Sequence, residues 1–373
     1  MDKRLCRELL RSLEKPQASK RAFIGLDGFV DSVIHVVEKR FDANNYQRFE
    51  TIQAYAQHLL EGAGLSMNIE MLPLENKIGG NGTFFASGLE KYGVPLTYIG
   101  AIGKEQVHPQ FANFACKPGC RRVGVADPAQ TDALEFRDGK IISSKLRPLN
   151  ELRWEDLLYA LPMEAFVREM EQADLFSFNN WTMIPAMSEI WRHILEDVLP
   201  RLRTGARGKW AFFDLADPTK RSKEDVLEAM ELIRRFHGAG FTTALGLNLR
   251  EARLIGAILE GGKAVSTEES LEATVRRVSD FLKIDCVVVH PVDRAACVRD
   301  GVYFETEGPY CASPKISTGA GDIFNSGFVY GLLRQWDSEL CLLTGVLSSG
   351  FYVRNGFSPD LEELRAFCEE FAR

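Results

Sequence analysis

The chain has 373 residues, of which 45% are hydrophobic and 26% charged, and its formal net charge is −7. This composition excludes an intrinsically disordered chain and supplies enough apolar side chains for a sizeable core. The acidic balance argues against nucleic acid or an anionic membrane as the main partner, which leaves a small molecule as the expected ligand.

The N-terminal stretch, MDKRLCRELLRSLEKPQASKR, is a charged amphipathic segment and does not resemble a signal peptide. No part of the chain has the ~18 consecutive apolar residues that a membrane span requires. The eight cysteines lack the spacing of a disulfide framework, and Cys116 and Cys120 have no second pair at zinc spacing. We therefore expect a cytoplasmic protein with reduced thiols and no metal at that pair.

Short β-branched or aromatic runs alternate with longer amphipathic segments along most of the chain. The predicted strands cover residues 22–30, 96–103, 174–180, 209–216, 242–248 and 286–292. This alternation predicts an α/β fold, a three-layer sandwich in which helices cover both faces of a mostly parallel central sheet. Such sheets bind ligands beyond the carboxyl ends of their strands, so residues at those ends carry the most functional weight.

Two regions interrupt this alternation, at residues 31–79 and 121–149. The second contains Asp138-Gly139 between two extended runs, which is the turn signal of a β-hairpin. We expect the two regions to form a small β-strand lid on a single domain of residues 1–373.

Two acids lie near the end of the first predicted strand. Asp31 would face the crevice, where a carboxylate accepts hydrogen bonds from two hydroxyl groups at once. Asp27 competes for this position, but it is followed by glycine and is typical of a turn former. Further along, Gly79 and Gly80 would let a ligand approach the backbone, and Asn81 offers an amide; the alternative is a hinge or bulge before a helix.

The segment Asn179-Asn180-Trp181 ends another predicted strand near the expected crevice. These side chains would hydrogen-bond and stack against a ligand, or they would simply cap the next helix. The sequence leaves both possibilities open.

Asn248 and Glu251 lie where a predicted strand passes into a helix, and residues three apart share one helix face. A carboxylate there is suited to a hydrated magnesium ion, which retains several waters and takes only one or two protein carboxylates. The alternative is a surface glutamate in a first helical turn.

The turn Gly319-Ala320-Gly321 directly precedes Asp322 and an apolar helical pattern, and so marks a helix N-terminus. The first amides of a helix have no intrahelical partner, and glycines let a phosphate approach them closely. Asp322 would point a carboxylate at the same place and accept a proton from an attacking hydroxyl. The arrangement predicts phosphoryl transfer; the alternative is an acid that only complements the helix dipole behind a glycine turn.

Together these motifs resemble the ribokinase, or PfkB, family of carbohydrate kinases, in the family's order and over nearly the whole chain. KISTGAGD resembles the C-terminal signature D-T-x-G-A-G-D, and KIGGNGTFFASGLEKYG resembles the N-terminal signature. FFDLADPTKR is similar to F-D-x-N-x-R, and GLNLREARLI to N-x-x-E. The resemblance implies a ribokinase-like fold, an ATP- and magnesium-dependent sugar kinase, and a homodimer formed through the lid.

The resemblance also assigns three groups of site residues. The general base and its anion hole are Asp322 with Gly319, Ala320 and Gly321. The sugar-binding residues are Asp31, Gly79, Gly80, Asn81 and Asn180. The residues for ATP and magnesium are Thr318, Asn248 and Glu251, the last acting on the metal through water.

Three departures from the family pattern matter. Ile316 replaces the acid at the head of the C-terminal signature, which removes a ligand of the monovalent cation that activates many relatives. Phe84 displaces the asparagine that follows the glycines in ribokinases, so the sugar pocket differs from theirs. His290-Pro291-Val292 replaces the usual T-x-G on the nucleotide side, and His290 fits packing or a nucleotide contact better than a role as base.

Two other functions remain open. A nucleoside kinase of the same family would have an aromatic pocket around Phe29, Phe84 or Trp181. A degenerate kinase fold kept for binding or regulation would explain Ile316 and Val292, although the intact Gly-Ala-Gly-Asp turn argues against it.

Overall fold

The described residues form two β-sheets, and the larger has nine strands in the order β14-β13-β12-β11-β10-β9-β1-β5-β6. The computed structural model describes residues 1–16, 19–261 and 269–373. The parallel strands are β1 (Ala22–Leu26), β5 (Leu96–Gly100), β6 (Arg121–Gly124), β9 (Leu175–Asn179), β10 (Trp210–Asp214), β11 (Thr242–Leu247) and β12 (Cys286–Val289). Two antiparallel strands, β13 (Arg294–Arg299) and β14 (Val302–Glu307), close one edge.

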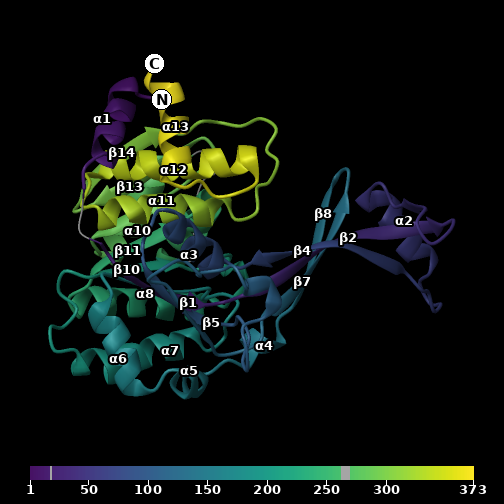
Figure 1. Cartoon of the computed structure of the whole chain (residues 1–373), viewed down its shortest axis with the longest axis horizontal. Coiled ribbons are helices and arrows are strands. Elements are labelled where there is room, and N and C mark those ends of the chain that lie inside the picture. The colour runs from purple at the N-terminus through teal and green to yellow at the C-terminus, as the bar shows by residue number, and fades with distance from the viewer. Residues whose placement is uncertain (17–18, 262–268) are drawn as a thin grey trace.

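Helices cover both faces of this sheet (Figure 1). One face carries α1 (Lys3–Leu13), α3 (Asn81–Lys91), α11 (Ala320–Leu333), α12 (Ser338–Asn355) and α13 (Leu361–Ala372). The other carries α5 (Trp154–Ala160), α6 (Met163–Gln172), α7 (Met187–His193), α8 (Lys223–Gly238), α9 (Leu249–Leu259) and α10 (Leu271–Leu282). Every residue of β1, β5 and β9 is buried, as expected for strands covered on both faces. The predicted three-layer α/β sandwich is confirmed.

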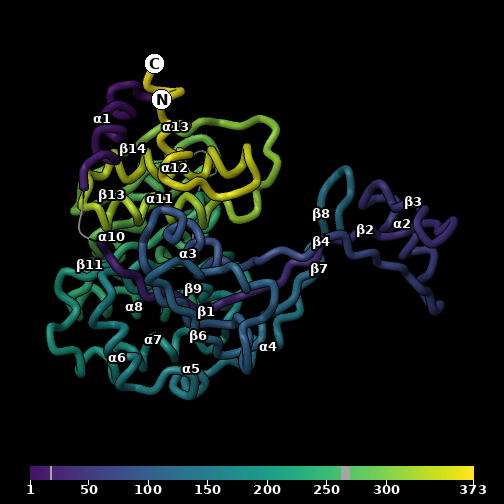
Figure 2. The backbone as a smooth tube through the Cα atoms, in the orientation of Figure 1, coloured from purple at the N-terminus to yellow at the C-terminus, as the bar shows by residue number. Residues whose placement is uncertain are grey.

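Short single turns complete the body of the molecule. They are α4 (Arg147–Asn150), η1 (Pro109–Phe111), η2 (Ile194–Val198), η3 (Leu199–Arg201) and η4 (Pro218–Lys220). The backbone trace brings the two ends of the chain together, because α1 packs against α13 (Figure 2). Among the described residues, no helix is both long and apolar enough to span a membrane.

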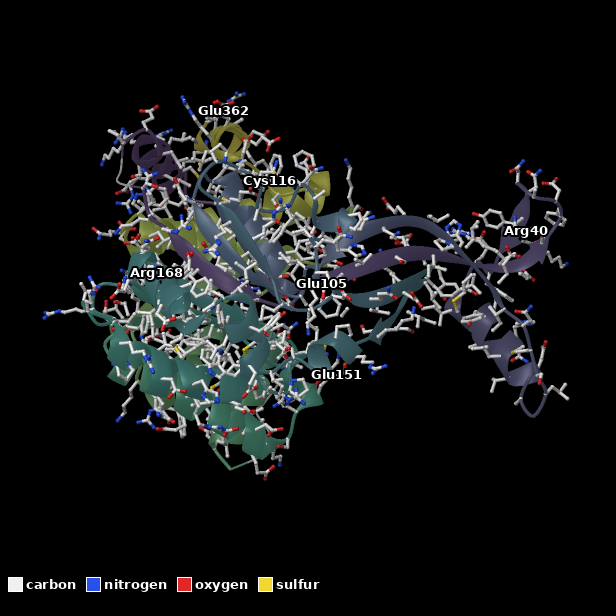
Figure 3. The ribbon with its side chains drawn as sticks, turned by 60° about the horizontal axis from the view of Figure 1, so that its bottom comes forward. Arg40, Glu105, Cys116, Glu151, Arg168 and Glu362 are labelled. Atoms are coloured by element: carbon white, nitrogen blue, oxygen red, sulfur yellow. The ribbon has the colours of Figure 1, made fainter. Side chains whose placement is uncertain are left out.

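The second sheet projects from the body as an arm (Figure 1). Its central strand β2 (Phe29–Arg40) pairs with β4 (Glu70–Gly79), β7 (Ala129–Phe136) and, at the far end, β3 (Tyr46–Arg48). Strand β8 (Gly139–Lys145) pairs with β7, and Phe136 lies opposite Gly139, which confirms the predicted hairpin. Figure 3 places Arg40 near the far end of the arm.

The arm also contains a helix, α2 (Ile52–Glu61), within the region 31–79 that interrupts the strand–helix alternation. The arm has its own small core, made of Ile34, Val36, Phe49, Tyr55, Leu134 and Phe136. Strand β6 lies in the region 121–149 but pairs with β5, and so it extends the central sheet. The division of the chain into one domain with a lid stays a prediction.

Candidate active site

Five neighbouring strands of the central sheet lead into polar residues. In the order β1, β9, β10, β11 and β12, these residues are Asp27, Asn180, Asp214, Asn248 and His290. Because the five strands are parallel, their carboxyl ends share one edge of the sheet. The sheet therefore gathers residues from distant parts of the chain at this edge, which is where ligands of α/β folds bind.

Helix α11 begins in the predicted glycine turn at this edge. Gly319 has a left-handed backbone (φ +84°), and no side chain among the described residues caps the helix. A Cβ at Gly319 would lie 3.1 Å from Tyr352 Oη, and one at Gly321 would lie 2.9 Å from His290 Cε1. Glycine thus suits both positions. The Ala320 amide donates to the Ser317 carbonyl oxygen at 3.2 Å, and the start of the helix is otherwise suited to an external acceptor such as an anion.

A chain of three side chains leads to Asp322 at the start of α11. Asn180 Nδ2 donates to Asn81 Oδ1 at 2.8 Å, and Asn81 Nδ2 donates to Asp322 Oδ1 at 2.8 Å. The Asn180 side-chain oxygen in turn accepts a hydrogen bond from the Met183 amide at 3.2 Å. Three of the residues predicted from sequence therefore meet in one network, and Asn180 also caps the turn that follows β9.

Burial raises the pKa values of three carboxylates at this edge, and the charge of Asp214 adds to the effect on the other two. Burial, and then the charge of Asp214, hold the pKa of Asp322 well above its usual range. Burial raises the pKa of Asp214 to about 6, and burial together with Asp214 raises the pKa of Glu251 to about 8. Perturbed carboxylates of this kind are typical of catalytic sites, where a raised pKa makes a stronger base.

Asp214 is a site residue that sequence reasoning did not assign. Asn325 Nδ2 donates to its Oδ2 at 2.8 Å, and the Ala216 amide donates to its Oδ1 at 2.8 Å. The only indication in the sequence that Asp214 belongs to the site was its position in FFDLADPTKR, which is similar to F-D-x-N-x-R. That motif alone did not indicate that its charge acts on both Asp322 and Glu251.

A cavity of about 330 Å³ lies beside the glycine turn. Polar and backbone groups line one part, including Asn248, Ser317, Ala320 and Gly321, and the rest is mainly apolar, with Pro291, Val292, Phe324, Val346 and Val353. The His290 ring lies 4.8 Å from that of Phe324, and burial lowers the pKa of His290 to about 4. His290 is therefore neutral near pH 7, which supports its interpretation as a packing or nucleotide-contacting residue.

The comparison with known proteins identifies the family. A profile of the family described as prokaryotic ketohexokinase matches residues 3–371. The chain belongs to the prokaryotic ketohexokinase family. Ketohexokinase from Haloferax volcanii is 25% identical to it over 370 residues, which span 98% of this chain and 94% of that protein. The chain is accordingly an ATP-dependent sugar kinase, and the resemblance to ribokinase-type carbohydrate kinases is confirmed.

Solved structures show the same fold for this kinase. Ribokinase from Arabidopsis thaliana in complex with ribose and ATP matches 95% of the chain with a TM-score of 0.63 and 14% identity, and 99% of that protein is covered. Adenosine kinase from Sinorhizobium meliloti matches 95% of the chain with a TM-score of 0.61 and 16% identity, again with 99% of that protein covered. Because both kinds of kinase share the fold, the architecture does not select the substrate.

The residues predicted for magnesium in this sugar kinase form the N-terminus of α9. Asn248 Oδ1 accepts from the Glu251 amide, and Glu251 Oε2 accepts from the Asn248 amide, both at 2.9 Å. Glu251 keeps one carboxylate oxygen outside this capping box, and the charge of Asp214 acts on the same carboxylate. A hydrated cation fits this surplus of negative charge, although the described residues contain no cluster of three or more ligands that would hold a metal directly.

The two acids after β1 have different surroundings. Asp27 is completely buried, and its two oxygens accept hydrogen bonds from the backbone amides of Asn81 and Gly82. Asp31 lies on β2 with its carboxylate against Gly79, where a Cβ would overlap it, and burial raises its pKa. Asp31 thus has fewer hydrogen bonds within the protein than Asp27, with one from Thr131, and the sugar-binding role preferred for it from sequence stays a prediction.

The aromatic residues considered for a nucleoside pocket do not form one. Trp181 is completely buried in the core, with its ring covered by Arg221 at 4.6 Å and its Nε1 bonded to Ser188 Oγ at 3.0 Å. Phe29 is buried in the same core, whereas Phe84 lies beside Tyr352. The stacking hypothesis for Trp181 is thus wrong, because the hydrophobic core, and not the crevice, takes this side chain.

Thr318 lies just ahead of the glycine turn, and its side chain is exposed. Its carbonyl oxygen accepts a hydrogen bond from Tyr352 Oη at 2.8 Å. This bond holds the approach to the turn, whereas a contact between Thr318 and nucleotide stays a prediction.

Proposed function

We propose that this kinase transfers the γ-phosphate of ATP to a hydroxyl group of a ketohexose. The family and the Haloferax volcanii relative are both named for ketohexokinase, which supports a ketohexose as acceptor. One observation supports the mechanism. Hydrogen bonds link the side chains of Asn180, Asn81 and Asp322 in series, and Asp322 lies in the first turn of α11.

Asp322 is the general base in this mechanism. Its Oδ1 accepts a hydrogen bond from Asn81, so its Oδ2 is available to take the proton of the attacking hydroxyl. Its raised pKa increases its strength as a base. The amides of the Gly319-Ala320-Gly321 turn would hold the transferring phosphoryl oxygens, which carry the charge of the transition state.

The cavity beside the turn would receive the nucleotide, with its apolar wall against the base and the amides of α11 toward the phosphates. Glu251 would hold magnesium through water, with Asn248 fixing its orientation and Thr318 near the phosphates. When bound, magnesium neutralises phosphate charge. Side chains and backbone amides of the chain itself carry out the remaining steps, which are proton acceptance and binding of the phosphoryl oxygens.

The sugar would lie at the root of the arm, between the carboxylate of Asp31 and the paired amides of Asn81 and Asn180. Glycine at positions 79 and 80 leaves room for the carboxylates of Asp31 and Asp27, which a Cβ there would crowd. Closure of the arm over the sugar would exclude water that otherwise hydrolyses ATP. We also propose that two arms pair in a homodimer, since the arm exposes Phe41, Leu60, Leu65, Met71, Leu74 and Ile142.

The decisive experiment compares Asp322→Asn with Gly321→Val, measuring turnover with fructose and melting temperature together. Asp322→Asn should lower kcat by about 10²–10⁴-fold, as expected for a lost general base, with little change in nucleotide affinity. Gly321→Val should instead displace His290, because a Cβ at this position would lie 2.9 Å from His290 Cε1, and should weaken nucleotide binding and transfer together. Near-normal turnover of folded Asp322→Asn would refute the mechanism.

A further inference from the structure

Asp27 has no role in the mechanism above, yet it is completely buried and fully hydrogen-bonded. Its Oδ2 accepts from the Asn81 amide and its Oδ1 from the Gly82 amide, both at 2.9 Å. These are the first amides of α3, whose own N-cap residue, Gly80, has no side chain to offer. Asp27 therefore caps α3 from a distant part of the chain, and its negative charge suits the helix N-terminus.

The surroundings of Asp27 leave little space around its carboxylate. A Cβ at Gly80 would lie 3.0 Å from the carboxylate, and one at Gly82 would lie 2.9 Å from Oδ1. Tyr98 Oη donates to the Asp27 backbone oxygen and lies 3.4 Å from its Oδ1. A buried carboxylate is costly unless it is hydrogen-bonded, so this packing fixes the side chain against the two amides.

The contact also lies at the root of the arm. Strand β2 begins at Phe29, strand β4 ends at Gly79, and these two residues are the first pair of the β2–β4 ladder. Asp27 precedes Phe29 by two residues, and Asn81 follows Gly79 by two. The Asp27–Asn81 hydrogen bond therefore joins the two chain segments just where they leave the body and enter the arm.

Asn81 is at once held by Asp27 and bonded to the proposed base. Its backbone amide donates to Asp27, and its side chain donates to Asp322 Oδ1 at 2.8 Å while it accepts from Asn180. We propose that Asp27 is a positioning residue, which fixes Asn81 and thereby ties the root of the arm to the orientation of Asp322. This inference rests on the proposed role of Asp322 as base.

The first test is the variant Asp27→Asn, which keeps the size of the side chain but offers only one acceptor oxygen to two amides. We expect kcat to fall by about 10- to 100-fold through misplacement of the base, with little change in the KM for ATP. The matched control is Asp285→Asn, since Asp285 also accepts a backbone amide, from Thr243 at 2.7 Å, outside the site. The control should lower the melting temperature without lowering kcat.

A double-mutant cycle separates positioning from general destabilisation. If Asp27 acts through Asn81, then Asp27→Asn should lower kcat little further in an Asn81→Ala background. Amide hydrogen exchange at Gly82, measured on the intact enzyme, should be faster in Asp27→Asn. If Asp27→Asn does not fold, Tyr98→Phe is the milder variant, and it should lower kcat in the same non-additive way.

Additive losses in the cycle, an unchanged kcat in Asp27→Asn, or unchanged exchange at Gly82 would each overturn the proposal. These results differ from failure of the proposed function, which would appear as near-normal turnover in Asp322→Asn. Hydrogen exchange at Gly82 measures the hydrogen bond between Asp27 and the start of α3 independently of turnover.

Discussion

Replacing Glu251 by Gln should stabilise the protein at pH 8 and slow phosphoryl transfer at the same time. The glutamine keeps an oxygen to accept the Asn248 amide, so the capping box of α9 remains, while the charge that Asp214 disfavours is lost. Burial and the Asp214 charge raise the pKa of Glu251 from 4.5 to about 8, so the folded protein disfavours the ionised form.

The sign follows from proton linkage. Between pH 4.5 and about 8 the folded state binds more protons at Glu251 than the unfolded state, so the stability contributed by this group is lost as the pH rises. The full pKa change corresponds to roughly 5 kcal/mol as an upper bound. With solvent screening and charge sharing with Asp214, we expect about 1–2 kcal/mol, or about 1–3 °C for a chain of this size.

Thermal unfolding of both proteins at pH 5 and pH 8, with and without magnesium, measures this effect. The melting temperatures should agree at pH 5, and the variant should melt higher at pH 8. Magnesium with ADP should raise the melting temperature of the wild-type protein more than that of the variant, because the carboxylate attracts the cation. The variant should also need more magnesium for turnover.

Glu363→Gln is the matched control, because Glu363 forms the same capping box with Asp360 at the N-terminus of α13, away from the site. It should change neither turnover nor the response to magnesium. Equal melting temperatures of wild type and Glu251→Gln at pH 8 would refute the claim that the folded protein disfavours the ionised Glu251. An unchanged magnesium titration would refute its role in binding the cation.

Three further predictions concern the cation, the base and the arm. Exchange of sodium for potassium should change the rate little, because Ile316 stands where relatives carry an acid; a large, saturable activation by potassium would contradict this. Asp214→Asn should move the acidic limb of the kcat/KM pH profile to lower pH, because the Asp214 charge raises the pKa of Asp322; a limb that stays in place or moves upward would contradict the coupling. Sedimentation should give a dimer, and Leu60→Lys on the exposed face of the arm should shift it toward monomer with its melting temperature little changed, whereas a wild-type monomer would exclude pairing of the arms.

The sequence by itself determined the features that depend on neighbouring residues. Alternating strands and helices indicated the three-layer α/β sandwich, because periodicity along a segment shows whether one face or both are buried. Asp138-Gly139 predicted the hairpin between β7 and β8, and Gly319 to Asp322 predicted the N-terminus of α11. Turns and helix starts are chosen within a few residues, so their chemistry can be recognised without a partner.

Only the tertiary structure decided which distant side chains meet. Asn81 and Asp322 are 241 residues apart, and their hydrogen bond exists because β1 and β9 to β12 end at one edge, beside the starts of α3 and α11. The same packing directs Asp27 to the amides of α3, and it buries Trp181. Burial and long-range contact follow from strand order and helix packing, and no local pattern around any of these residues specifies either.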